Sequence, residues 1–131
     1  MAITIKRIEA PVKVEGDVYE YSHSQATATM SKTLPLKKDF LGRKMRLLSV
    51  EVLISAAPTT SESFTVTLDS HLGASYDVVL FSNNPSLTSA TSIVNIWDTP
   101  YDLHPLDELV VAYANTNTNT VGFRLLLRER F

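Results

Sequence analysis

The sequence predicts an all-β fold: a single antiparallel β-sandwich of about eight strands, jelly-roll-like, with an N-terminal arm. Three observations support this prediction. Apolar and polar residues alternate with a period of two in successive short segments. Turn-forming residues separate these segments, and nowhere do apolar residues keep a helical spacing over three turns. A chain of 131 residues is long enough for one domain that carries its own core.

The expected elements follow from this alternation in chain order. Ile3, Ile5 and Ile8 indicate a short first strand or arm, so we expect an arm or strand at residues 1–16 and the sandwich at residues 17–131. Strands are expected at residues 18–31, 46–54, 64–68, 76–81, 93–97, 109–114 and 123–130. The clearest is residues 64–68, where Phe64, Val66 and Leu68 alternate with threonines.

Two connections between the expected strands stand out. Residues 34–46 contain Pro35, Gly42 and mixed charges, with Phe40 and Leu41 as an apolar anchor. A connection of that length in a small domain is usually functional or an interaction element. Residues 115–120 repeat Asn-Thr between two strong strands, and we expect a solvated hairpin loop there.

Composition excludes several classes of function. Lys and Arg number 12 and Asp and Glu 14, for a formal net charge of -2, which argues against nucleic-acid binding through bulk charge. The absence of cysteine excludes disulfides, a thiolate nucleophile and cysteine metal sites. No apolar run approaches the roughly 18 residues of a membrane span, and residues 1–7 lack the order typical of a signal peptide. We therefore expect neither a membrane partner nor direct contact with nucleic acid.

No catalytic residues are predicted. His71 follows Ser70 directly, and neighbouring strand residues point to opposite faces, so the pair is not placed for nucleophilic catalysis. His71 is expected to be a surface histidine at the end of a strand. Glu51 and Glu62 are conceivable as the paired carboxylates of a glycosidase, but a domain this small seldom holds a deep cleft beside a core. We expect the protein not to be an enzyme.

Residues 98–108 are denser in possible metal ligands than the rest of the chain. These are Asp98, Asp102, His104, Asp107 and Glu108. Carboxylates on a loop can hold Ca²⁺, but the spacing is not that of an EF-hand, and Pro100 and Pro105 indicate rigid turns. No metal and no cofactor is predicted.

The candidate functional residues are instead partner or oligomer contacts. They are Ile3, Ile5 and Ile8 of the arm, Lys37, Lys38, Phe40 and Arg43 of the long connection, the aromatics Trp97 and Tyr101, and the last residue, Phe131. Basic residues can orient an acidic partner, and aromatics can anchor an interface. The alternatives are that the charges belong to solvated edges and loops, and that the aromatics are ordinary core and rim residues.

A family resemblance gives these residues a context. Residues 47–52 alternate ahead of a short polar turn, residues 64–70 and 73–80 follow, and Ile96 and Trp97 precede a proline turn and residues 106–113. In this order of parts the chain resembles small virion proteins of tailed bacteriophages, most of all jelly-roll capsid decoration, or cement, proteins. The resemblance covers about two-thirds of the chain and contains no ligand motif, so no functional residue carries over from it.

The resemblance implies a structural virion protein that binds the assembled head and stabilises it. The implied partners are the major capsid protein and further copies of the chain, as a homotrimer. The implied location is the capsid surface of the virion, after synthesis in the host cytoplasm. The alternative is a carbohydrate- or receptor-binding module of a phage tail, motivated by Trp97 and Tyr101 beside acidic turn residues.

Overall fold

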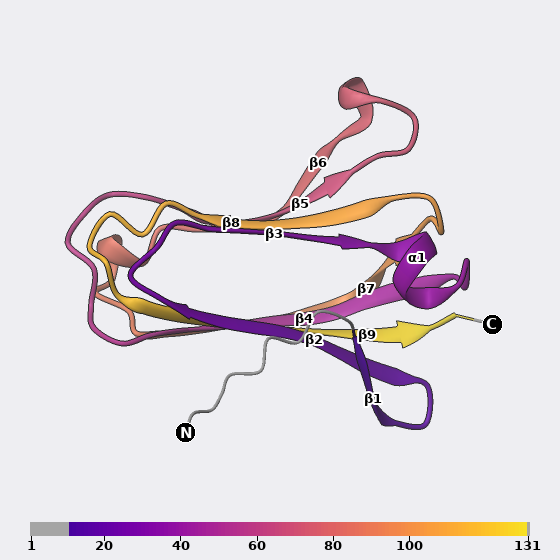
Figure 1. Cartoon of the computed structure of the whole chain (residues 1–131), viewed down its shortest axis with the longest axis horizontal. Coiled ribbons are helices and arrows are strands. Elements are labelled where there is room, and N and C mark those ends of the chain that lie inside the picture. The colour runs from indigo at the N-terminus through magenta and orange to yellow at the C-terminus, as the bar shows by residue number, and fades with distance from the viewer. Residues whose placement is uncertain (1–10, 131) are drawn as a thin grey trace.

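Two antiparallel sheets packed face to face form the structure, a computed structural model that describes residues 11–130 (Figure 1). The five-stranded sheet has the order β1-β2-β9-β4-β7 and the four-stranded sheet the order β3-β8-β5-β6. The strands are β1 (Val12–Glu15), β2 (Val18–Ala26), β3 (Met30–Pro35), β4 (Met45–Ile54), β5 (Phe64–Asp69), β6 (Val78–Asn83), β7 (Ser92–Leu103), β8 (Glu108–Tyr113) and β9 (Thr120–Glu129). The predicted all-β sandwich is confirmed, with nine strands in the described part of the chain.

The strand pairing is that of a jelly roll. β2 pairs with β9, β3 with β8, β4 with β7 and β5 with β6, so the chain from β2 to β9 is a set of nested antiparallel pairs. Pairing of β4 with β9 and of β5 with β8 rolls these pairs into two sheets. Such a roll of eight strands is the jelly-roll arrangement, and β1 adds a ninth strand at the edge beside β2.

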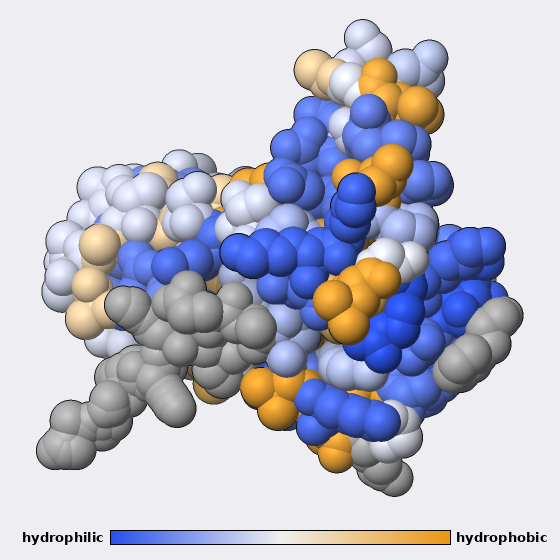
Figure 2. All heavy atoms as spheres, turned by 45° about the vertical axis from the view of Figure 1, so that its right-hand side comes forward, coloured by the Kyte–Doolittle hydropathy of each residue, from blue (hydrophilic) through white to orange (hydrophobic). Residues whose placement is uncertain are grey.

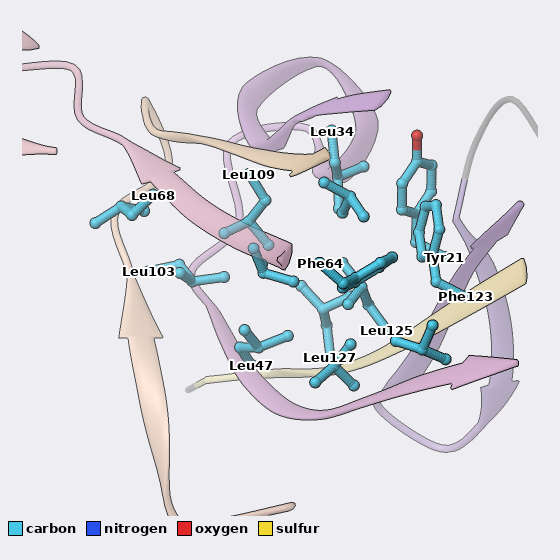
Figure 3. Packing of buried hydrophobic residues seen from close by; sticks show 14 of the residues in the cluster. Tyr21, Leu34, Leu47, Phe64, Leu68, Leu103, Leu109, Phe123, Leu125 and Leu127 are labelled. Carbon is cyan, nitrogen blue, oxygen red and sulfur yellow. The ribbon is translucent and has the colours of Figure 1, made fainter. Parts of the chain in front are cut away.

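The core lies between the sheets because alternate residues of each strand face inward. Phe64 on β5 is fully buried near its centre (Figure 3), with its ring about 6 Å from the rings of Tyr113 and Phe123. Tyr113 comes from the same sheet and Phe123 from the opposite one, so these rings join the two layers. Leu125 and Leu127 of β9 are also fully buried and alternate with the outward-facing Arg124 and Arg128.

The long connection at residues 34–46 holds a short helix, α1 (Leu36–Phe40), which the alternation of the sequence did not predict. A helix of five residues is too short to show a helical period. Leu36 and Phe40 are buried, and Leu41 ends the helix in the left-handed conformation with 82% of its surface exposed. Phe40 therefore anchors the connection as expected, together with Leu36, but the same expectation was wrong for Leu41, whose side chain points to solvent at the end of the helix. In the described residues no helix is long and apolar enough to cross a membrane.

The Asn-Thr run differs from the expected solvated hairpin. It joins β8 of one sheet to β9 of the other, and Asn115 is buried. The Asn115 side-chain amide donates to the carbonyls of Ala28 and Asn119, at 3.0 and 2.8 Å. Asn117 accepts from the backbone N–H groups of Thr59 and Thr60. The asparagines therefore tie three loops together at one end of the sandwich.

Replacing Phe64 with alanine tests the position of the core. We expect Phe64→Ala to lower the free energy of unfolding by about 3–5 kcal/mol, because it removes a fully buried ring between the sheets and leaves a cavity. Thr65→Ala, the next residue but on the outer face, should change it by only about 0.5 kcal/mol. Urea unfolding measures both, and equal effects would contradict this assignment of faces.

Candidate functional site

One side of the sandwich is left open between the edge strands β6 and β7. The short connections β2–β3 and β6–β7 each pass from one sheet to the other, so β6 and β7 share a side opposite to β1 and β3. The hydrophobic residues that pack only partly against the core all lie on these two strands: Leu80, Phe81, Ile93, Trp97 and Tyr101. The core is therefore covered less completely here than elsewhere in the described chain.

Apolar side chains are also exposed to solvent on these two strands. Val94 and Ile96 of β7 expose 57% and 70% of their surface, and Val78 and Val79 of β6 are exposed as well. Scattered apolar residues are normal on a protein surface, but Val94 and Ile96 are neighbours on the outer face of β7, and a contiguous apolar group indicates an interaction site. We call the surface formed by β6 and β7 the open side.

The β5–β6 hairpin extends the open side outward. It projects from the sandwich and carries the short 3₁₀ helix η1 (Ala74–Tyr76) at its tip (Figure 1). Leu72 and Tyr76 near the tip are exposed. Figure 2 shows apolar patches on this projecting hairpin among hydrophilic residues. The hairpin thus presents apolar groups where they contribute nothing to the core of the same chain.

Asp107 fastens the loop at the tip of this hairpin to the β7–β8 loop. Its buried carboxylate accepts hydrogen bonds from the His71 ring Nδ1 at 2.7 Å and from the His71 backbone N–H at 2.9 Å. The other carboxylate oxygen accepts from the His104 backbone N–H at 3.3 Å. The rings of His71 and His104 stack, with centroids 3.9 Å apart. We call His71, His104 and Asp107 the clasp.

The pKa of Asp107 reflects two opposing influences. Burial of the carboxyl group disfavours its charged form, whereas hydrogen bonds from the His71 ring and from the His71 and His104 backbones, together with the charge of His71, favour it. The hydrogen bonds and charge prevail, and the pKa of Asp107 lies below its ordinary value of 3.8. Asp107 is therefore a carboxylate at neutral pH and holds the clasp closed.

The clasp offers three possible metal ligands, but its geometry does not fit one metal ion. The ligand atoms of His71, His104 and Asp107 lie within 4.8 Å of one another. An imidazole binds a metal in its own ring plane, and these two planes are only 16° from parallel in a stack. His104 Nδ1 also accepts a hydrogen bond from the Leu106 N–H at 3.1 Å. The arrangement is that of a structural clasp, and the other expected ligand candidates, Asp98 and Asp102, lie on β7 outside it.

A groove on the outer face of the five-stranded sheet is a second candidate site. It has a volume of about 600 Å³ and crosses β2, β9 and β4, where Gly122 contributes no side chain. Ser22, Ser24 and Thr120 bring hydroxyl groups to its lining. Arg124 lies 3.2 Å from Glu51 and 3.7 Å from Glu20, so one end carries both charges. Glu62, the other carboxylate considered from the sequence, instead binds the backbone N–H of Thr116 at 3.0 Å.

The contact residues expected from the sequence are distributed over several places. Lys37 and Lys38 are exposed on α1, whereas Phe40 is fully buried, so its ring has no surface left for a partner. Arg43 donates to the Tyr19 hydroxyl at 3.0 Å and lies 3.6 Å from Glu129. Trp97 and Tyr101 are half-buried on the open side. Ile3, Ile5, Ile8 and Phe131 lie outside the described residues.

Sequence reasoning did not single out Val94, Ile96, the groove or the clasp. His71 and Asp107 are 36 positions apart, and no local pattern connects them. The groove arises from registers between three strands, which alternation alone does not give. The apolar residues of β7 were visible in the sequence, but their exposure depends on β7 being an edge strand.

Comparison with known proteins adds no assignment to this geometry. No protein-family model matches the chain, and no curated protein matches it.

The clasp should contribute stability that depends on pH. Since the pKa of Asp107 is lower in the folded state, its contribution is complete above pH 3.8 and is lost as the pH falls through the lower folded value. At pH 7, we expect Asp107→Asn to lower the free energy of unfolding by about 1–3 kcal/mol. The difference from the wild type should shrink well below pH 3.8. Urea unfolding at both pH values measures this, with Asp98→Asn, an exposed carboxylate, as the matched control. A difference that is the same at both pH values would contradict the role of the ionised carboxylate.

Proposed function

We propose that this chain is a structural virion protein, a capsid decoration or cement protein that binds the assembled head and stabilises it. The observation that carries the proposal is the apolar surface of the open side and its projecting hairpin. A sandwich that worked alone would gain nothing by leaving these groups in water, whereas burial against a neighbour is favourable in proportion to the area covered. The protein would then act through contacts of its surface with neighbouring proteins, and not through a reactive centre.

The fold and the resemblance support the same proposal. Jelly rolls are frequent in viral capsid proteins and in lectins, although a fold alone does not determine a function. The order of strands and turns that resembles phage decoration proteins belongs to this jelly roll. The proposed partners are accordingly the major capsid protein and other copies of the chain, as a homotrimer on the capsid surface.

The proposed mechanism is stabilisation by mass action. A protein that binds the assembled shell but not its separated subunits shifts the equilibrium toward the shell. Attachment through several copies at once strengthens contacts that are weak individually. The surface proposed to contact the shell is the N-terminal arm or the α1 connection, where Lys37, Lys38 and Leu41 are exposed, and the open side is proposed to contact further copies of the chain.

Deletion of residues 1–10 tests this function. Because residues 11–130 contain the two sheets and their core, we expect the shortened protein to unfold at nearly the same urea concentration as the full chain. Co-sedimentation with assembled head shells of the phage that encodes the chain should be lost, while the full-length protein binds these shells. Separated capsid subunits are the control and should not bind. Normal decoration by the shortened protein would remove the arm from the proposal, and failure of the full chain to bind shells would overturn the proposal.

The groove favours a second candidate function, a carbohydrate- or receptor-binding module of a phage tail. Its hydroxyl groups and its paired Arg124 and Glu51 offer donors and acceptors to a polar ligand. Trp97 and Tyr101, which motivated this alternative, lie on β7 and do not line the groove.

A glycan array distinguishes the two candidate functions. The decoration function predicts no retention of any glycan, with calcium or without it. Gly122→Val supplies the blocking control, because a Cβ at Gly122 would meet its nearest atom, Ser24 Cβ, at an ordinary contact distance of 3.5 Å. Retention by the wild type that Gly122→Val abolishes would favour the glycan-binding function and the groove as its site.

A further inference from the structure

The four edge strands of the sandwich are not equally protected against pairing with another strand. β1 is short, follows Pro11 and has an irregular register between Lys13 and Glu15. β3 ends in Pro35 and places Lys32 opposite the buried Val111, on the inward face of the sheet. Proline, irregular register and an inward lysine are all devices that prevent edge-to-edge association. The segment of β7 from Ser92 to Trp97 carries none of them.

The backbone groups at the free edge of β7 follow from its pairing with β4. The Ile54 N–H donates to the Thr91 carbonyl at 2.9 Å, so Ile54 and Thr91 form a hydrogen-bonded pair next to the pair of Leu53 with Ser92. Hydrogen-bonded and non-hydrogen-bonded pairs alternate in an antiparallel ladder. The N–H and C=O groups of Ser92, Val94 and Ile96 therefore point away from β4, toward solvent.

The order of polar and apolar residues along this edge is a palindrome centred on Asn95. Ile93 and Val94 precede Asn95, and Ile96 and Trp97 follow it. Two polar residues then flank the segment on each side, Thr91 and Ser92 before it and Asp98 and Thr99 after it. An identical strand running antiparallel, in register at Asn95, would therefore find apolar residues opposite apolar ones and polar residues opposite polar ones.

We propose that β7 pairs with β7 of a second copy, antiparallel and across a two-fold axis at Asn95. This register places Val94 opposite the partner's Ile96 on the outer face and Ile93 opposite the partner's Trp97 on the inner face. Opposite residues of an antiparallel pair share a face, and both faces satisfy that condition here. The backbone groups of Val94 and Ile96 that point to solvent in the single chain form the new hydrogen bonds, and two five-stranded sheets become one continuous sheet.

The second copy is the occupant because the pattern is self-complementary. A two-fold interface uses the same patch on both subunits, so its strand must match itself when reversed. A different partner strand would not require the palindrome. β6, the other edge of the open side, has an irregular register with β5 between Val66 and Thr67, and its sequence, Val-Val-Leu-Phe-Ser-Asn, lacks this symmetry. In Figure 1 the β5–β6 hairpin projects from the layer that does not contain β7.

This inference does not depend on the proposed function. A lectin-like protein could dimerise in the same way, and a trimer formed through another surface would combine with the two-fold contact into a hexamer of D₃ symmetry. In either case, the wild type should have a native mass that is an even multiple of the 14.5 kDa chain. A monomer or a simple trimer at the highest soluble concentration would overturn the proposal.

Proline substitution tests which edge is used. Val94→Pro removes an N–H group that points to solvent in the single chain, so the fold should tolerate it while β7–β7 pairing is blocked. Thr33→Pro is the matched control on β3. The Leu36 N–H donates to the Asp107 carbonyl, so Leu36 and Asp107 form a hydrogen-bonded pair one step beyond the β3–β8 register. Because hydrogen-bonded and non-hydrogen-bonded pairs alternate, Thr33 belongs to a non-hydrogen-bonded pair, and its N–H points away from β8 toward the free edge of the sheet. Native mass spectrometry should show half the wild-type mass for Val94→Pro and the wild-type mass for Thr33→Pro. An unchanged mass in Val94→Pro would overturn the proposal.

Cysteine substitution tests the register and does not depend on tolerance of proline. The chain has no cysteine, so a single introduced thiol can bridge only to its copy in another chain. Asn95 would face the partner's Asn95 as a non-hydrogen-bonded pair, with Cα atoms about 4.5 Å apart, a separation that a disulfide can span. We expect Asn95→Cys to form a linked dimer on mild oxidation and Val94→Cys, two residues out of register with its copy, to remain unlinked. Linking of Val94→Cys alone, or of neither variant, would overturn the proposal.

Discussion

The constraint on which this structure depends is that an open sandwich of two sheets has four outer strands, each with unpaired backbone groups. In this chain, on the side that contains β1 and β3, β1 has an irregular register and β3 has Pro35 and the inward Lys32, whereas on the side that contains β6 and β7 the segment of β7 from Ser92 to Trp97 has none of these devices. The core is also covered less completely on that second side. The edge of β7 from Ser92 to Trp97 is therefore both unprotected and next to the part of the core that is covered least, so association with another strand is most favourable there.

The ends of the sandwich are held by polar groups instead. Asp107 and Asn115 are the buried polar residues of the described chain, and each one binds backbone groups of separate loops. Buried polar groups stabilise a structure only when their hydrogen bonds are satisfied, and these two accept or donate several each. Asp107 fixes the projecting hairpin to the β7–β8 loop, so the apolar groups on that hairpin are presented at a defined place. Through the clasp, the buried carboxylate of Asp107 thus determines where the exposed apolar side chains of the hairpin lie.

Strands in which apolar and polar residues alternate could be predicted from the sequence, whereas contacts between residues far apart in the chain could not. The alternation in β4, β5 and β9 predicted these strands closely, because each buries one face against the opposite sheet. Residues 18–31 were expected as one segment, but Thr27 adopts a positive φ of 61° and the chain turns there into the other sheet. The Asn-Thr run was expected to be solvated, because a repeat of polar residues carries no sign that its side chains will bind loops more than 50 positions away. The clasp and the groove depend on such long-range registers, so the candidate sites were less predictable than the fold.

The proposed two-fold contact and the proposed shell contact would use different parts of the surface. Pairing through β7 would use the edge of the five-stranded sheet, whereas α1 and the projecting hairpin belong to the connections and the edge of the other layer. A decoration protein must bind its own copies and the shell at the same time, because the gain from multivalent attachment is lost when geometry prevents simultaneous contacts. If β7 joins two copies, the α1 connection of each copy stays available, and a dimer of a decoration protein can then bridge two points on a shell. Because the two surfaces are separate, the open side can be proposed to bind a second copy of the chain while the α1 connection is proposed to bind the shell.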